Sequence, residues 1–292
     1  MSPEERLEAP PFADVIGDPI AQSKSPLIHN FWLEKTGTDA SYQRELVGPG
    51  RLQDYLEGRR KHPAWRGCNV TMPHKQAIVP MLDRIDPLAE RIGAVNTVVR
   101  EADGTLAGHN TDCSGFLEPL REHLGQTHLF RMARILGTGG AARAIVSGLA
   151  AEGFTLVLAG RDPGKAKQML DELAPGDEHH AVDLAYFAEA TDFAFDDRQG
   201  MFDLVVNASP LGMKGQPALD FDWSHAPPGA IAYDIVTDPV NTGFLGSAAA
   251  SGHGTIDGLS MLIGQAAKAF ELFFGVKPPR EHDAELRERL NG

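Results

Sequence analysis

Short runs of apolar residues alternate along this chain with longer segments whose apolar residues recur at helical spacing. In the second half, Ile135-Leu136 leads into a glycine-rich turn, a helix-like segment follows, and a second apolar run covers Thr155 to Ala159. Strands that alternate with helices form a parallel sheet with helices on both faces. The pattern therefore predicts an α/β fold with a doubly wound sheet, whose further strands are expected at 181–182, 204–207 and 231–235.

The chain before Asp112 shows the same alternation and is expected to form an α/β unit of its own. Ser25 and Pro26 are residue types typical of an N-cap and a first helical position, which predicts a helix over 26–36. Asp103-Gly104 between two apolar runs indicates a β-hairpin. The predicted strands are 14–17, 66–70, 94–100 and 106–109, and a second helix is predicted over 74–83.

The glycine-rich turn has the G-x-G-x-x-A form of a dinucleotide-binding βαβ unit. Gly137 allows the tight turn, Gly139 lets the backbone approach a pyrophosphate, and the small Ala142 lets the helix pack on the strand. A pyrophosphate would bind the free N–H groups at the helix N-terminus. We therefore expect residues Gly137, Thr138, Gly139, Gly140 and Ala141 to bind a dinucleotide.

The end of the second strand indicates which dinucleotide. Proteins that bind NAD usually place an acidic residue there to hold the ribose 2′-hydroxyl, whereas this chain has Gly160-Arg161, with Lys165 one turn further. A planar cation suits a 2′-phosphate, so NADP is favoured and NAD stays possible. Asp162 could repel that phosphate, or it could cap a helix beginning at Pro163.

The tail of the chain has no strand that could pair with the predicted sheets. A helix is expected over 113–124, the dinucleotide unit begins near Arg131, and two further helices are expected over 259–274 and 279–290. The tail is therefore expected to pack back on the first domain. The predicted division is 1–112, 113–257 and 258–292.

Composition narrows the class of protein further. Of 292 residues, 42% are hydrophobic and 23% charged, as is usual for a globular chain long enough for two domains. The formal net charge of −13 argues against nucleic-acid and anionic-membrane partners. The two cysteines cannot form a disulfide framework, the acidic N-terminal segment is unlike a targeting peptide, and no apolar run would span a membrane. These features fit a cytoplasmic protein.

Polar clusters follow several of the predicted strands, where α/β folds bind ligands. Ser23 and Ser25 could bind a carboxylate at a helix N-terminus, or Ser25 could merely cap that helix. Lys75, early in its predicted helix, could exchange a proton, or it could be an ordinary surface lysine. Asp112 could bind substrate hydroxyls and pair with Lys75, or it could cap a helix, and Asn96 could simply complete a turn.

Other kinds of chemistry find no support in the sequence. The residues around His74 and His109 give no reason to expect more than a solvated imidazole, so neither histidine is expected to be catalytic. No group of histidine, cysteine and acidic residues has metal-ligand spacing, so no metal is expected.

Five segments together resemble the shikimate dehydrogenase family, which includes shikimate and quinate dehydrogenases. They cover most of the chain in the family's order: GDPIAQSKSPLIHNF, NVTMPHK, GAVNTVV with GHNTD, GTGGAAR with GRDPGKA, and DGLSMLIGQAAKAF. The resemblance implies a substrate-binding and catalytic domain over 1–112, an NADP-binding Rossmann domain over 113–257, and C-terminal helices returning to the first domain over 258–292.

The resemblance also implies a role for each matching residue. It implies Lys75 and Asp112 as the catalytic pair. The implied substrate-binding residues are Ser23, Ser25, Thr71, Asn96, Asp112, Tyr233 and Gln265. The implied cofactor-binding residues are Gly137, Thr138, Gly139, Gly140, Ala141, Arg161, Lys165, Ile231 and Gly258.

The activity that the resemblance implies is reversible, NADPH-dependent reduction of 3-dehydroshikimate to shikimate in the biosynthesis of chorismate and aromatic amino acids. The partner would be this small-molecule substrate, with the protein a monomer or a homodimer. Two segments depart from the family: Gly160-Arg161-Asp162 replaces the usual Asn-Arg-Thr, and Thr237-Asp238 replaces Tyr-Asn. An NAD-using quinate/shikimate dehydrogenase and a non-catalytic NADP-binding sensor are the alternatives.

Overall fold

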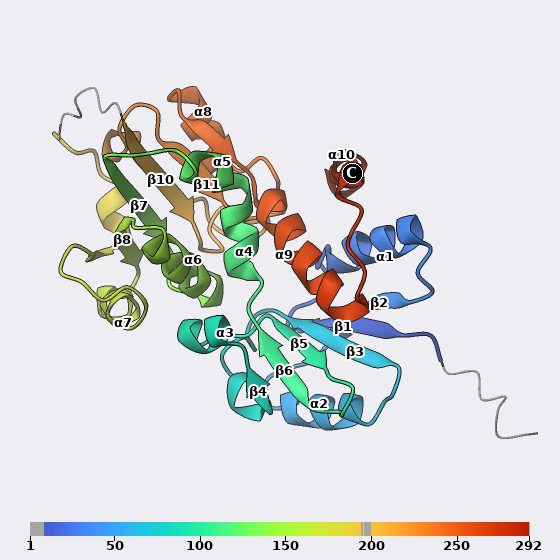
Figure 1. The fold of residues 1–292 in the computed structure, drawn as a ribbon. Helices are drawn as coiled ribbons and strands as arrows, with labels where there is room; N and C mark the ends of the chain where they lie inside the picture. The colour runs from blue at the N-terminus through green and yellow to red at the C-terminus, as the bar shows by residue number, and fades with distance from the viewer. Residues whose placement is uncertain (1–8, 194, 196–199, 292) are drawn as a thin grey trace, which may run out of the picture. The chain divides into compact units, whose positions relative to one another are not determined.

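A computed structural model describes residues 9–193, 195 and 200–291 of the chain (Figure 1). It divides into two compact units. The first contains the residues up to Thr111 together with those from Ala266 onward, and the second is Asp112–Gln265. The division therefore falls inside the long helix α9, Gly258–Phe274, which the sequence predicts over 259–274.

The first unit is built on a sheet of mixed direction (Figure 1). Its strands are β1 (Phe12–Gly17), β2 (Ser41–Leu46), β3 (Trp65–Val70), β4 (Arg84–Ile85), β5 (Thr97–Arg100) and β6 (Leu106–His109), in the order β2-β1-β3-β5-β6-β4. β1 runs parallel to β2 and β3, whereas β5 runs antiparallel to β3 and β6. The predicted hairpin is therefore confirmed as β5 and β6.

Helices of the first unit bury the faces of this sheet. They are α1 (Ser25–Thr36), α2 (Leu52–Arg60), η2 (Val79–Met81), α3 (Pro87–Ile92), the end of α9, η6 (Arg280–His282) and α10 (Asp283–Asn291). Trp65, Cys68 and Val98 belong to one apolar cluster, together with Leu56 of α2. A second cluster joins Val15 of β1 to Phe273 of α9, so residues from the two ends of the chain share one core.

Two local predictions in the first unit are wrong. The segment 74–83 forms turns and the short η2, not an α-helix. Pro80 explains the difference, because it has no N–H to donate and its ring clashes with the carbonyl four residues earlier in a helix. Lys75 therefore does not lie at a helix N-terminus. Ser25 is the first residue of α1 and not its cap, since the N-cap is Lys24, which makes no side-chain capping bond.

The second unit is built on a fully parallel sheet, as predicted. Its strands are β7 (Phe130–Leu136), β8 (Thr155–Gly160), β9 (His180–Asp183), β10 (Met201–Asn207), β11 (Ile231–Asp234) and β12 (Gly254–Ile256), in the order β12-β11-β10-β7-β8-β9. Every neighbouring pair is parallel. This is the doubly wound order of dinucleotide-binding sheets, in which the strand order reverses between β7 and β10.

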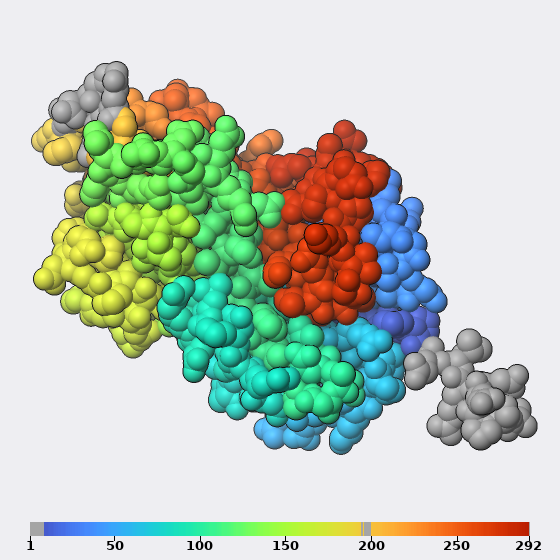
Figure 2. Space-filling model, in the orientation of Figure 1, coloured from blue at the N-terminus to red at the C-terminus, as the bar shows by residue number. Residues whose placement is uncertain are grey.

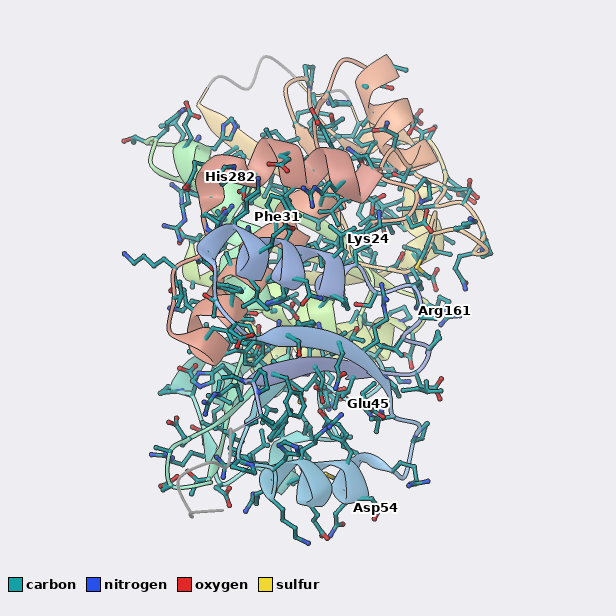
Figure 3. All side chains as sticks on the ribbon, turned by 90° about the vertical axis from the view of Figure 1, so that its right-hand side faces the viewer. Lys24, Phe31, Glu45, Asp54, Arg161 and His282 are labelled. Carbon is teal, nitrogen blue, oxygen red and sulfur yellow. The ribbon has the colours of Figure 1, made fainter. Side chains whose placement is uncertain are left out.

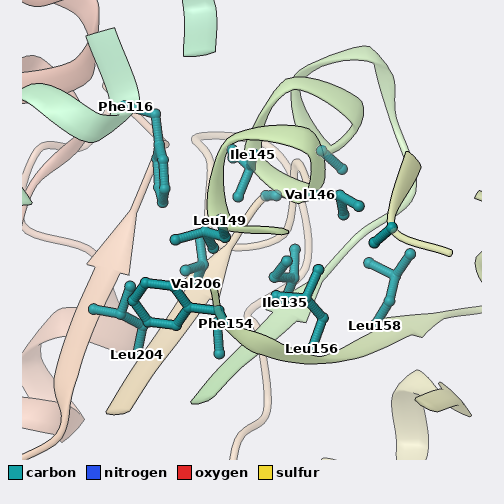
Figure 4. Packing of buried hydrophobic residues seen from close by; sticks show 14 of the residues in the cluster. Phe116, Ile135, Ile145, Val146, Leu149, Phe154, Leu156, Leu158, Leu204 and Val206 are labelled. Atoms are coloured by element: carbon teal, nitrogen blue, oxygen red, sulfur yellow. The ribbon is translucent and has the colours of Figure 1, made fainter. Parts of the chain in front are cut away.

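The core of the second unit lies between this sheet and the helices on its two faces. The helical elements are α4 (Asp112–Leu117), η3 (Glu118–Leu120), α5 (Arg121–Leu124), α6 (Gly140–Ala151), α7 (Pro163–Leu173), η4 (Leu184–Phe187), η5 (Trp223–His225) and α8 (Gly243–Ala250). Figure 4 shows Ile135, Leu156 and Val206 of three strands packed against Ile145 and Leu149 of α6. The helix predicted over 113–124 is instead three short helical pieces, α4, η3 and α5, with Pro119 in the middle one.

The C-terminal segment packs within the first unit, where α10 contacts α1. Figure 2 shows its red atoms beside the blue atoms of α1. The Arg289 guanidinium lies 4.8 Å from the centre of the Phe31 ring, and Lys35 Nζ lies 2.7 Å from Glu285 Oε2. Phe31 and His282, labelled in Figure 3, lie on facing sides of this contact. A cation on an aromatic face and an ion pair thus join α1 to α10.

His29 of α1 is the most deeply buried titratable ring of the first unit. It is fully buried, its ring stacks on Tyr42 at 4.0 Å between centroids, and neither ring nitrogen has a hydrogen-bond partner among the described residues. Burial lowers the pKa of His29 to about 3. The unfolded chain therefore binds a proton at His29 before the folded protein does.

This burial predicts a dependence of stability on pH. Because the folded-state pKa lies below the unfolded value, stability is lost as the pH falls below about 6.5, at ~1.4 kcal/mol per pH unit and ~2 kcal/mol by pH 5. Urea unfolding of the wild type and of His29→Phe should show a shallower acid loss in the variant. At pH 8, where His29 is neutral in both states, no such difference in slope is expected. Equal slopes between pH 6.5 and 5 would contradict the assignment.

Candidate functional site

The glycine turn after β7 has the geometry that a bound pyrophosphate requires. Gly137 has φ +122°, and a Cβ there would lie 2.7 Å from the Ala208 carbonyl oxygen, so only glycine fits. Gly139 is the N-cap of α6, and a Cβ on it would meet nothing within 4 Å. Ala142 is fully buried in the core beneath the turn. The backbone N–H groups at the start of α6 are therefore open to an anion.

Two exposed cations follow β8, the strand next to the glycine turn. Arg161, labelled in Figure 3, follows β8, and Lys165 lies in the first turn of α7. Asp162 is the N-cap of α7: its Oδ1 accepts from the backbone N–H groups of Gly164 at 3.0 Å and Lys165 at 3.2 Å. The capping interpretation of Asp162 is thus confirmed. Its carboxylate is hydrogen-bonded to the N-terminus of α7, so Arg161 and Lys165 could bind a 2′-phosphate.

Strand register brings the polar segments of the first unit to one edge of its sheet. Ile16 pairs with Val70, so the loops that follow β1 and β3 leave the sheet side by side. Asn69 pairs with Thr97, and Thr97 pairs with His109, so the start of β5 and the end of β6 lie at the same edge. The segments containing Ser23, Thr71, Asn96 and Thr111 therefore converge there.

The serine loop, residues 22–25, is held in place by two cations. Arg44 of β2 donates from Nε to the Ser23 carbonyl at 2.9 Å and also from a terminal nitrogen. Lys24, labelled at the start of α1 in Figure 3, donates from Nζ to the Leu290 carbonyl at 2.9 Å. The Ser23 hydroxyl accepts from the Ser25 N–H at 3.3 Å. The loop thus presents both serines beside the N-terminus of α1.

Asn96 lies at the centre of a buried hydrogen-bond network. Its Oδ1 accepts from the Thr111 N–H at 2.7 Å and from the Thr97 hydroxyl at 3.0 Å, and its Nδ2 donates to the Thr111 hydroxyl at 2.9 Å. Asn69 Nδ2 donates to Thr97 Oγ1 at 3.0 Å, and the Tyr42 hydroxyl donates to Asn69 Oδ1 at 2.6 Å. These bonds fix which way each amide faces.

The two predicted catalytic residues belong to different units. Lys75 lies in the loop after β3 and is half-buried. Its carbonyl accepts from the Val95 N–H at 2.8 Å. Thr71, also half-buried, donates its N–H to Ile16 and accepts from His74. Asp112 is buried and begins α4 of the second unit. Their roles in chemistry remain predictions.

The other predicted contact residues lie in the second unit. Tyr233 of β11 is fully buried and stacks on Phe116 at 4.6 Å, so its ring is a core residue of this unit. Gln265 is nearly buried, and its Nε2 donates to the Leu262 carbonyl at 2.9 Å. Ile231 packs at the margin of the core, and Gly258 begins α9 where a Cβ would lie 2.3 Å from the Val236 carbonyl oxygen.

The structure also identifies supporting residues that the sequence analysis did not single out. Arg44 and Tyr42 both lie on β2, a strand that the apolar pattern does not reveal. His74, expected to be a solvated and non-catalytic imidazole, is instead buried, and its Nε2 donates a hydrogen bond to the Val47 carbonyl at 2.6 Å. Among the residues that the structure describes, no group of histidine, cysteine and acidic side chains could hold a metal ion, and no helix could span a membrane.

Fold and site together define the class of protein: a dinucleotide-binding α/β unit joined to a second α/β unit with a polar site, the general organisation of a dehydrogenase. The family model described as shikimate dehydrogenase substrate binding domain matches residues 15–98. The model described as shikimate 5′-dehydrogenase C-terminal domain matches residues 258–285.

Similarity to individual proteins extends over nearly the whole chain. Shikimate dehydrogenase (NADP(+)) of Sphingopyxis alaskensis is 48% identical over 284 residues, covering 97% of both chains. The structure of shikimate 5-dehydrogenase from Thermus thermophilus, in complex with NADP(H) and shikimate, matches with a TM-score of 0.80 and 34% identity, covering 96% of this chain and 99% of that one. The chain belongs to the shikimate dehydrogenase family.

A third match comes from the quinate branch of the family. Quinate dehydrogenase from Corynebacterium glutamicum, in complex with NAD, has a TM-score of 0.80 and 31% identity, over 96% of this chain and 99% of that one. Proteins named as shikimate and as quinate dehydrogenases therefore share this fold, so individual side chains must set the choice of substrate and cofactor.

The capping role of Asp162 makes a direct prediction about stability. Asp162→Ala should lower the free energy of unfolding by ~1 kcal/mol, since it leaves two N–H groups at the start of α7 without their acceptor. Asp162→Asn is the matched control, because asparagine caps equally well. Urea unfolding of the three proteins measures the difference. Equal losses in both variants would show that charge, and not capping, is what Asp162 contributes.

Proposed function

We propose that this protein is an NADP-dependent shikimate dehydrogenase, which reversibly reduces 3-dehydroshikimate to shikimate. The observation that carries the proposal is the convergence of the serine loop, the Thr71–Lys75 segment and Asn96 at one edge of the first sheet. Hydroxyl, amide and ammonium groups gathered there suit a small polyhydroxylated acid. The 48% identity to an NADP-dependent relative supports the same conclusion.

The residues of the second unit fit the cofactor. The turn from Gly137 to Ala141 leaves N–H groups open for the pyrophosphate, and Arg161 with Lys165 would hold the 2′-phosphate. We assign Ile231 and Gly258 to the surroundings of the nicotinamide, following the family. When the cofactor is bound, it would supply the hydride that reduces the substrate carbonyl.

The first unit would bind and orient the substrate. The hydroxyls of Ser23 and Ser25 would donate to its carboxylate at the N-terminus of α1, with two cations holding the loop in place. Thr71 and Asn96 would bind ring hydroxyls. We assign Gln265 and Tyr233 to the same substrate following the family, although Tyr233 is buried against Phe116 in this structure.

Lys75 and Asp112 would carry out the proton chemistry. In reduction, Lys75 Nζ donates a proton to the carbonyl oxygen as the hydride reaches the carbon, and in oxidation it accepts that proton back. Asp112 would orient the reacting hydroxyl and hold the lysine by a charge-assisted hydrogen bond. A proton-transfer lysine serves a catalyst, whereas a cofactor-binding sensor does not require one.

The broader context follows from the family and from the composition. The reaction belongs to the biosynthesis of chorismate and aromatic amino acids. We propose a cytoplasmic enzyme, acting as a monomer or homodimer on a small molecule, with no nucleic-acid partner. The NAD-using quinate/shikimate dehydrogenase is disfavoured, because Asp162 is occupied as a helix cap and Arg161 and Lys165 remain beside it.

The proposed role of Lys75 is tested by removing its amine. Lys75→Met should lower kcat for shikimate oxidation by about 10²–10⁴-fold with a much smaller change in KM, since general acid–base catalysis has that magnitude. Lys61→Met, on an exposed lysine after α2, is the control and should leave both constants unchanged. Turnover at the wild-type rate in Lys75→Met would rule out the assignment.

The proposed role of Arg44 is to position the serine loop. Arg44→Leu keeps an apolar stem but removes both bonds to the Ser23 carbonyl, so KM for shikimate should rise about 10-fold to 100-fold, as expected for the ~1.5–3 kcal/mol of one hydrogen bond to a charged group. The KM for NADP and the kcat should change little. Initial rates with each substrate varied in turn measure both constants. A fall in kcat with an unchanged shikimate KM would contradict a positioning role.

A further inference from the structure

Position 160, at the end of β8, lies where dinucleotide-binding folds usually place a side chain toward the adenosine ribose. In this chain the position is Gly160. Its φ lies outside the left-handed region, so the backbone itself would accept any L-residue. The side chain of Thr138 is what opposes a side chain at this position: a Cβ there would lie 2.8 Å from Thr138 Cγ2, which is too close, and 3.6 Å from Thr138 Oγ1, which is an ordinary contact.

Only one rotation about χ1 of Thr138 clears this space. The rotamer that turns the Cβ hydrogen toward Gly160 places the methyl group where the hydroxyl was and moves the hydroxyl away, whereas the other rotamer leaves the hydroxyl in the space. The backbone beneath is fixed, because the Gly137 N–H donates to the Ala159 carbonyl at 2.8 Å and joins the glycine turn to the end of β8. Thr138 therefore occupies the space of a side chain at position 160.

We propose that Thr138 and Gly160 form a coupled pair that determines cofactor specificity, in which the Thr138 hydroxyl replaces the missing side chain at position 160 as a donor to the ribose 2′-phosphate of NADP. Thr138 is half-buried, and Arg161 follows directly after Gly160. The 2′-phosphate would thus be bound by a hydroxyl from the glycine turn and by the cations of Arg161 and Lys165. The inference rests on the proposed use of NADP and assigns a specific role to a residue of that site.

The coupling is tested with a double-mutant cycle on equilibrium binding of NADP to the purified protein, followed by calorimetry. Gly160→Ala should weaken NADP binding about 10-fold or more, because the new methyl group displaces the Thr138 hydroxyl from its position and a hydrogen bond to a charged group is lost. In Thr138→Ala/Gly160→Ala the new methyl group has space, so NADP binding should return to within about 3-fold of Thr138→Ala alone. Gly246→Ala, at an exposed helical glycine of α8 with nothing within 4 Å, is the matched control and should bind NADP as the wild type does.

The hydroxyl is tested separately by Thr138→Val, which keeps both branches and loses only the donor. NADP binding should weaken by about 10-fold while NAD binding is unchanged, since only NADP carries the 2′-phosphate. Thermal unfolding without cofactor identifies any variant that fails to fold, and the NADP-to-NAD affinity ratio is independent of such a loss.

The outcomes separate the inference from the proposed function. A wild-type protein that does not bind NADP would refute the proposed function itself. Wild-type binding with strictly additive effects of Gly160→Ala and Thr138→Ala would overturn the coupling. An equal loss of NADP and NAD affinity in Thr138→Val would overturn the role of the hydroxyl.

Discussion

The site of the first unit depends on strand register. Parallel pairing of β1 with β3 and antiparallel pairing of β5 with both β3 and β6 bring four separate polar segments to one edge. A slip of one residue would turn every side chain of a strand to the other face of the sheet. The buried network from Tyr42 through Asn69 to Asn96 opposes such a slip, because its amides would lose their partners. Core packing and site geometry are therefore fixed by the same pairing.

The second unit relies on a different constraint, the close approach of backbone segments at glycines. Gly137 lies against Ala208, and Gly160 lies against the side chain of Thr138. A side chain at position 137 would overlap the backbone of Ala208, and one at position 160 would displace Thr138 from its rotamer, while no side chain among the described residues caps the N-terminus of α6. Two local contacts then account for the residues that this chain has in place of the family's Asn-Arg-Thr segment. Asp162 caps α7, and Thr138 fills the space beside Gly160.

Much of this architecture could be predicted from the sequence, for physical reasons that also explain the errors. The buried strands β7, β8, β10 and β11 each contain a short apolar run, because both faces of a parallel sheet are covered. The edge strand β2, Ser41–Leu46, is mostly polar and exposed, so no apolar pattern reveals it. Missing β2 meant missing Tyr42 and Arg44, the two residues on it that support the site. The contact between Thr138 and Gly160 joins the glycine turn to the end of β8 and depends on how the two segments are spaced in the fold, which no local pattern encodes.

The most direct test of the proposed function is the initial rate of shikimate oxidation by the purified protein, with NADP and NAD as alternative cofactors and quinate as alternative substrate. We predict that turnover with shikimate and NADP exceeds every other combination, since the proposed role of Arg161 and Lys165 is to bind the 2′-phosphate and the Asp162 carboxylate is bound to the N-terminus of α7. Equal or faster turnover with NAD, or a preference for quinate, would contradict this account and place the protein in the quinate branch of its family.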